Sequence, residues 1–180
     1  MLTSQTSVIE STTPQLTLVL GGARSGKSRY AENLITACRP PWIFMATAEP
    51  GDAEMTERIA LHRRWRGPGW QTIEAPHDLT AALAAVAAHT PVLVDCLTLW
   101  LSNLMAAGRD PSREMEDLVR ALGQAGGPVV FVSNEVGLGI VPDNALARAF
   151  RDHAGRLNQR IAEVANSVFF VAAGLPLRLK

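Results

Sequence analysis

The stretch LTLVLGGARSGKS, residues 16–28, determines the fold that we expect for this chain. A short buried-strand pattern leads into a glycine-rich turn that satisfies G-x-x-x-x-G-K-[ST], and a helical pattern follows. Glycines let the backbone N–H groups of such a turn point at phosphate oxygens, and the positive end of the following helix strengthens their field. With glycine at ~7% of residues, a chance match occurs in well under about one chain in fifty. The stretch therefore predicts a P-loop that binds a nucleoside triphosphate.

The loop supplies the first candidate site residues. We expect Lys27 to reach the β- and γ-phosphates as a catalytic residue, and the Ser28 hydroxyl to ligate Mg2+. The residues of the turn expected to contact the nucleotide are Gly21, Gly22, Ala23, Arg24, Ser25, Gly26, Lys27 and Ser28.

A second Mg2+ ligand is expected at the end of a neighbouring strand. Asp95 ends the apolar run PVLVD, residues 91–95, and is the candidate. A strand-terminal aspartate is also a common helix cap or turn former. We favour the metal role because ligands of open α/β sheets bind at the carboxyl ends of the strands.

Short β-rich runs alternate with helical patterns along the rest of the chain. The expected strands are 16–20, 42–46, 70–75, 91–95, 128–133 and 168–173, several of them apolar throughout, as in a parallel sheet covered on both faces. The expected helices are 27–37, 53–66, 78–89, 98–122 in one or two pieces, and 144–165. Asp143 is available to cap the last helix, whose apolar stripe is Leu146, Phe150, Leu157, Ile161 and Val164.

This alternation predicts one α/β domain with a mostly parallel sheet flanked by helices. The domain is expected over residues 16–180, after a loose polar tail over residues 1–15 that lacks the features of a signal peptide. No apolar run reaches the ~18 residues needed to span a bilayer. We therefore expect no membrane span.

Composition narrows the class of partner. Lysine and arginine together number 17, as do aspartate and glutamate, so no global field attracts nucleic acid or an anionic membrane. The two cysteines, Cys38 and Cys96, form neither a disulfide framework nor a zinc motif, and a reducing cytoplasm fits them best. A GTPase switch is disfavoured because Asn-Lys-x-Asp is missing from the sequence and the one Asp-x-x-Gly, residues 152–155, falls inside a helix pattern. Small-molecule phosphoryl transfer is the leading class.

One histidine stands among arginines in EMTERIALHRRWRGPGW, residues 54–70. On a helix, His62 shares a stripe with Met55 and Ile59, as a histidine at the edge of the core would. Alternatively, nearby positive charge lowers the pKa of the imidazole, keeps it neutral and nucleophilic, and binds a phosphate under attack. A simple kinase has no need of this nucleophile, whereas a nucleotidyl transferase with a covalent intermediate does. The residues alone leave both interpretations open.

Several longer motifs follow one another in a fixed order. They are GGARSGKS at 21–28, E-M-x-x-R-I-x-x-H at 54–62, D-C-L-T at 95–98, S-N-E-V-G at 133–137 and L-A-R-x-F-R-D-x-x-G-x-x-N-Q at 146–159. Together they closely resemble the bifunctional adenosylcobinamide kinase/adenosylcobinamide-phosphate guanylyltransferase family of cobalamin biosynthesis. The resemblance covers about residues 16–180 and is far more specific than the P-loop motif alone.

The resemblance implies a RecA-like P-loop fold and a homo-oligomer, commonly a trimer. It implies phosphorylation of adenosylcobinamide by ATP or GTP, then transfer of GMP from GTP to the new phosphate, with Mg2+ as cofactor. His62 matches the family histidine that is guanylylated through a phosphoramidate. The nucleotide contacts expected outside the P-loop are Arg58, Arg63, Arg66, Glu74 and Asp95. The chain departs from the family pattern after Arg66, where Gly67, Pro68 and Gly69 replace the usual Arg-Pro.

Other residues are open to two interpretations. Glu135 follows a predicted strand and is either part of an ordinary connection or a metal or hydroxyl contact. Arg148, Arg151 and Arg156 form either a solvated helix face or a phosphate or subunit contact. Two rival functions stay open, a kinase in which His62 is structural and a nucleotide-binding regulator that turns nothing over.

Overall fold

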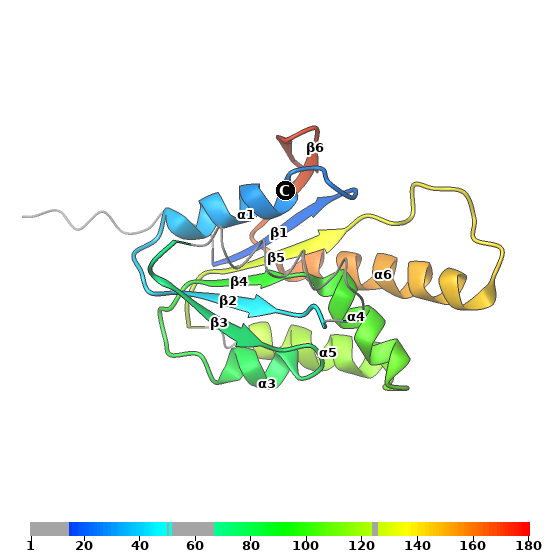
Figure 1. Ribbon diagram of the computed structural model, residues 1–180, viewed down its shortest axis with the longest axis horizontal. Helices are drawn as coiled ribbons and strands as arrows, with labels where there is room; N and C mark the ends of the chain where they lie inside the picture. Colours follow the sequence, from blue (N-terminus) through cyan, green and yellow to red (C-terminus); the bar gives the residue numbers. More distant parts are fainter. Residues whose placement is uncertain (1–14, 50, 52–66, 124–125) are drawn as a thin grey trace, which may run out of the picture.

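One sheet organises the computed structural model, which describes residues 15–49, 51, 67–123 and 126–180 (Figure 1). Its strands lie in the order β3-β2-β4-β5-β1-β6-β7, and neighbouring strands are parallel except for the antiparallel pair β6 and β7. The strands are β1 (Leu16–Gly21), β2 (Trp42–Ala46), β3 (Trp70–Glu74), β4 (Val92–Asp95), β5 (Val129–Asn134), β6 (Ser167–Ala172) and β7 (Leu175–Arg178).

Helices cover both faces of the sheet. Figure 1 shows α1 on one side and α3, α4, α5 and α6 on the other. Their bounds are α1 (Lys27–Thr36), α3 (Leu79–Ala84), α4 (Leu97–Ala106), α5 (Pro111–Leu122) and α6 (Ala145–Val164). The expected α/β architecture, with a mostly parallel sheet between helices, is confirmed.

The apolar strands divide their side chains between two core layers. Val19 packs with Ala31 and Ile35 of α1, whereas its neighbours Leu18 and Leu20 belong to the larger core on the opposite face. Because successive side chains of a strand point to opposite faces, a strand buried on both sides is mostly apolar, and in LTLVL only the buried Thr17 is polar. This explains why LTLVL shows no polar alternation.

One helix prediction is confirmed in its two-piece form, and two others differ from the structure. The pattern 98–122 forms two helices, α4 and α5, and Asp110 caps α5 by accepting hydrogen bonds from the backbone N–H groups of Ser112 and Arg113. The pattern 78–89 gives only α3, which ends at Ala84. The predicted Asp143 cap of α6 was wrong: Asn144 Oδ1 accepts from the Ala147 backbone N–H at 2.7 Å.

The apolar stripe of α6 is buried only in part. Leu157 and Ile161 are buried, whereas Leu146 is 71% exposed and Val164 is 40% exposed. Figure 1 shows the first turns of α6 reaching past the edge of the sheet, where no strand covers them. The expected helix 53–66 and residues 1–14 of the expected tail lie outside the described residues.

Candidate active site

The P-loop joins β1 to α1 at the carboxyl edge of the sheet. Gly21 is the last residue of β1, and Gly26 directly precedes α1 with a φ of 96°. Arg24 also has a positive φ, 55°, which bends the turn between these glycines. Gly26 has no side chain with which to cap α1, and the positive end of a helix that follows a glycine-rich turn favours a phosphate.

Lys27 is the most buried cation of the loop. The residue is only 7% exposed, and its Nζ donates a hydrogen bond to the Gly22 carbonyl at 3.0 Å. The side chain therefore folds back over the loop from the start of α1. A buried ammonium held against the loop backbone is placed to neutralise phosphate charge there.

Asp95 ends β4 at the same edge of the sheet. β5 lies between β4 and β1, with Asp95 level with Val132 and Gly21 level with Asn134. At ~4.8 Å per strand, about 10 Å separates the β1 and β4 axes. The edge thus brings the P-loop and Asp95 to opposite sides of one strand.

The charges of Asp95 and Lys27 both affect the pKa of the Cys96 thiol, which lies next to Asp95 in the chain. Burial first and the Asp95 carboxylate second raise the pKa of this thiol to about 11, while hydrogen bonds with Leu99 and Thr98 and the Lys27 ammonium oppose the rise. Both charges therefore act on one buried atom behind the site.

The oxygen donors at this edge fit Mg2+. Ser28 offers a hydroxyl and Asp95 a carboxylate, the ligand types that this ion prefers. Within the described residues, no group of three or more His, Cys, Asp or Glu side chains is gathered that could hold a metal. Mg2+ usually keeps several waters and binds through one or two protein oxygens together with substrate phosphates.

The raised pKa of Cys96 makes a prediction for stability. The ordinary value is 9.0 and the folded value about 11, so the unfolded chain loses its thiol proton first as the pH rises. The contribution is complete below pH 9 and is lost between about pH 9 and 11, which amounts to about 2–3 kcal/mol. Urea unfolding at intervals of pH measures it, and Cys96→Ala should flatten this part of the profile. An equal decline in wild type and Cys96→Ala would contradict the prediction.

A network of polar side chains fixes the end of β5 between the two halves of the site. The Asn134 backbone N–H and its Nδ2 both donate to Thr98 Oγ1, at 2.8 and 3.1 Å. Asn158 Nδ2 donates to the Asn134 carbonyl at 3.3 Å, while Ser133 Oγ donates to Asn158 Oδ1 at 2.7 Å. These contacts tie β5 to α4 and α6. Sequence reasoning assigned no role to Thr98 or Asn158, although both stand inside the quoted motifs.

In the loop after β5, Glu135 makes a contact other than the metal or hydroxyl contact considered from the sequence. Glu135 Oε1 accepts a hydrogen bond from the Gly137 backbone N–H at 2.6 Å, so the carboxylate turns back onto its own loop. The same loop exposes Leu138 and Ile140 almost completely, at 83% and 97%. A metal or hydroxyl contact by Glu135 stays a prediction.

The candidate arginines of α6 take part in local contacts. Arg148 Nη1 donates to the carbonyls of Pro142 and Asp143 at 2.9 and 2.7 Å, and so fastens the start of the helix. Arg151 pairs with its neighbour Asp152 at 3.1 Å. Arg148 and Arg151 therefore have protein partners in the structure, and a phosphate or subunit contact by either one stays a prediction.

Glu74 lies at the carboxyl edge but far from the P-loop. It ends β3, and β2, β4 and β5 separate that strand from β1. Four strand spacings of ~4.8 Å amount to about 19 Å. The structure does not bring Glu74 to the phosphate end of a nucleotide in the loop, and Glu74 lies instead beside the end of β2.

Residues on either side of the stretch 52–66, which carries His62, are held by hydrogen bonds. His62, Arg58, Arg63 and Arg66 themselves lie outside the described residues. Before the segment, Thr47 Oγ1 exchanges hydrogen bonds of 2.7 Å with the backbone of Cys96. After it, the Gly69 carbonyl accepts from the Trp42 backbone N–H at 2.9 Å.

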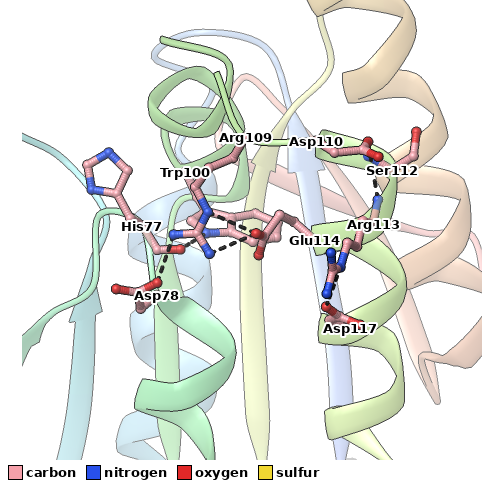
Figure 2. A network of polar contacts seen from close by, with 9 residues as sticks. All are labelled: His77, Asp78, Trp100, Arg109, Asp110, Ser112, Arg113, Glu114 and Asp117. Carbon is pink, nitrogen blue, oxygen red and sulfur yellow. Dashed lines mark hydrogen bonds and ion pairs between the residues drawn. The ribbon is translucent and has the colours of Figure 1, made fainter. Parts of the chain in front are cut away.

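A second polar network holds the β3–α3 turn in place (Figure 2). Arg109 lies between Asp78 before α3 and Glu114 of α5, with ion pairs of 2.7 Å to each. Hydrogen bonds to Asp78 and then Glu114 raise the pKa of this guanidinium. Trp100 Nε1 donates to the His77 carbonyl at 2.8 Å, and His77 Nδ1 lies 3.7 Å from Glu49 Oε1. Contacts from α4 and α5 thus brace the sheet edge next to residue 49.

In the part of the chain that the structure describes, every helix is too short or too polar to span a bilayer.

Solved structures with similar folds share little sequence with this chain. An ATPase from the type III secretion system of pathogenic bacteria has a TM-score of 0.54 and 12% identity, over 91% of this chain and 56% of that one. A protein of Pyrococcus horikoshii OT3 has a TM-score of 0.52 and 10% identity, over 92% of this chain and 86% of that one. These likenesses show the fold alone, an α/β sheet flanked by helices.

Curated relatives are much closer in sequence. The bifunctional adenosylcobalamin biosynthesis protein CobP of Pseudomonas aeruginosa is 50% identical over 167 residues, which cover 91% of this chain and 96% of the relative. The bifunctional adenosylcobalamin biosynthesis protein CobU of Salmonella typhimurium is 40% identical over 91% of this chain and 98% of its own length. The family model described as cobinamide kinase / cobinamide phosphate guanyltransferase matches residues 17–179. This chain therefore belongs to the cobinamide kinase / cobinamide phosphate guanyltransferase family of enzymes.

Proposed function

We propose that this chain phosphorylates adenosylcobinamide with a nucleoside triphosphate and then transfers GMP from GTP to adenosylcobinamide phosphate through a guanylyl-His62 intermediate. The observation that carries the proposal is the buried Lys27 ammonium on the P-loop, across one strand from Asp95. The family match supplies the acceptor.

In the kinase step, the backbone N–H groups of the P-loop hold the β- and γ-phosphates. The cobinamide hydroxyl oxygen attacks the γ-phosphorus, the bond to the bridging oxygen of the diphosphate breaks, and the hydroxyl proton leaves to solvent or a nearby base. Lys27 neutralises the charge that gathers on the phosphate oxygens. When bound, Mg2+ would add charge neutralisation there, with Ser28 and Asp95 as the residues that would hold it.

In the guanylyl step, a neutral ring nitrogen of His62 attacks the α-phosphorus of GTP, and pyrophosphate leaves as the N–P bond forms. A phosphate oxygen of adenosylcobinamide phosphate then attacks the same phosphorus, the N–P bond breaks, and His62 recovers its lone pair. Arg58, Arg63 and Arg66 stand within four residues of His62 in the sequence, and we assign to them the stabilisation of the developing charge.

Two labels separate the proposed reactions. Purified protein is incubated with Mg2+, adenosylcobinamide and either γ-labelled ATP or γ-labelled GTP, and then with α-labelled GTP. We expect the γ-label to enter cobinamide phosphate and the α-label to enter the GDP-linked product. Removal of divalent metal by EDTA should lower both yields at least about 100-fold, and excess Mg2+ should restore them. The γ-label alone would indicate a kinase, while nucleotide binding with neither product would indicate a regulator.

Association and location complete the proposal. Exposed apolar residues gather at the β5–α6 loop and the start of α6, a pattern that supports self-association: Leu138, Ile140, Val141 and Leu146. We propose a homo-oligomer, as a trimer, and light scattering would distinguish it from a 19.4 kDa monomer. The buried free thiols Cys38 and Cys96 support a cytoplasmic location.

A further inference from the structure

The C-terminal hairpin touches the P-loop. β6 pairs with β1 on one side and with β7 on the other, and Figure 1 shows the hairpin beside the start of α1. Its turn contains Ala173 and Gly174, whose φ angles are 51° and 78°. The Gly174 backbone N–H donates a hydrogen bond of 2.8 Å to the Ser25 carbonyl in the P-loop. A segment nearly 150 residues away in sequence therefore reaches the phosphate-binding turn.

The approach between the hairpin and the loop is close at two P-loop glycines. A Cβ on Gly26 would lie 3.0 Å from the Gly174 Cα, tighter than ordinary contacts allow. A Cβ on Gly21 would lie only 2.5 Å from the Val171 carbonyl oxygen on β6. Both glycines are therefore required by packing against the hairpin as well as by the approach of a phosphate.

We propose that the Ala173–Gly174 turn is a positioning element that fixes the P-loop backbone for the triphosphate. Ser25 C=O and Gly26 N–H belong to one planar peptide, and in a trans peptide the two point in opposite directions. By holding the Ser25 carbonyl, Gly174 aims the Gly26 N–H away from the hairpin, toward the side expected to hold the phosphates. The inference rests on the proposed nucleotide binding by the P-loop.

The geometry of Gly174 allows a matched pair of variants. A Cβ added at Gly174 meets no heavy atom within 4 Å, so a side chain there adds bulk without a clash, and only its effect on φ matters. Asparagine adopts positive φ readily, whereas a β-branched valine strongly resists it. Gly174→Asn should therefore keep the turn and Gly174→Val should distort it.

The test measures the Kd for GTP with Mg2+, the KM for the nucleoside triphosphate and the kcat of the kinase reaction, and the melting temperature of each variant. We expect Gly174→Val to raise both the Kd and the KM about tenfold with a smaller change in kcat, and Gly174→Asn to stay within about twofold of wild type. Leu177→Thr, an exposed change on β7 away from the turn, controls for general weakening of the hairpin. If Gly174→Val does not fold, Gly174→Ala takes its place, because it carries a milder form of the same φ penalty.

The outcomes separate the inference from the function on which it rests. Wild-type affinity in both the valine (or alanine) and asparagine variants would overturn the positioning role while leaving nucleotide binding intact. Equal loss in Gly174→Asn and Gly174→Val would also overturn it, because a side chain rather than the backbone would then be responsible. Failure of the wild type itself to bind GTP would refute the proposed function.

Discussion

Lys27→Ala is expected to lower the kinase kcat at least about 100-fold, a loss of about 2.7 kcal/mol of transition-state stabilisation. The Lys27 ammonium is nearly buried and its Nζ lies 3.0 Å from the Gly22 carbonyl, inside the turn that we propose binds the phosphates. Charge on the γ-phosphate oxygens builds up during transfer, so the lost cation matters most in the transition state. Initial rates with γ-labelled ATP and adenosylcobinamide measure the loss.

Two neighbouring substitutions make this prediction specific. Arg29→Ala removes an exposed cation two residues further along α1 and should change kcat by less than about threefold. Lys27→Arg keeps the charge but replaces a compact ammonium with a planar guanidinium that cannot occupy the same place, and activity should stay low. Near-normal kcat in Lys27→Ala would rule out the assigned role of the P-loop.

His62→Ala is expected to lower guanylyl transfer at least about 1,000-fold while kinase activity stays within about threefold of wild type. The two reactions should separate because, in the proposed mechanism, only GMP transfer passes through a covalent intermediate on the protein, whereas the kinase step uses the P-loop and its cation. Formation of the GDP-linked product from α-labelled GTP, beside phosphorylation from γ-labelled ATP, measures the two rates in one preparation.

His153→Ala serves as the matched control, because it removes a histidine from α6 and leaves the 54–70 segment unchanged. Both activities should persist in this variant. If His62→Ala lost the kinase reaction to the same extent as guanylyl transfer, a structural role at the edge of the core would explain the data better than a nucleophile.

The sequence predicted the features that depend on local patterns. The P-loop follows from four fixed residues in a strand–turn–helix context, and the central strands follow from runs that are apolar on both faces. The place of Asp95 also followed, because parallel strands bring their carboxyl ends to one edge. The register of the sheet places Asp95 across one strand from Gly21, and no sequence pattern predicts that separation.

Features that depend on tertiary contacts were not predicted. β7 has only four residues, includes Pro176, and begins after a turn in which Ala173 takes a positive φ that alanine seldom adopts. The choice of Asn144 over Asp143 as a helix cap depended on which side chain could reach the Ala147 N–H. A nucleotide contact by Glu74 stays a prediction, and its distance from the P-loop came only from the strand order, which puts four spacings between β3 and β1.

The polar network behind the site needed the structure for the same reason. Thr98, Asn134 and Asn158 come from α4, β5 and α6, and nothing in their sequence spacing shows that they meet. Their positions inside the motifs shared with the family were the one available signal. Buried polar side chains that satisfy one another specify a single arrangement, which suits a site whose two halves sit on different strands.

Guanylyl transfer through His62 requires GTP to leave its α-phosphate, as GMP, on this chain. The most direct measurement incubates the protein with Mg2+ and α-labelled GTP, denatures it, and follows label retained on the protein through acid and alkali treatment. We expect label in wild type that is labile to acid and stable to alkali, as a phosphoramidate is, and no label in His62→Ala. Intact GTP binding with no retained label, or equal label in His62→Ala, would contradict it.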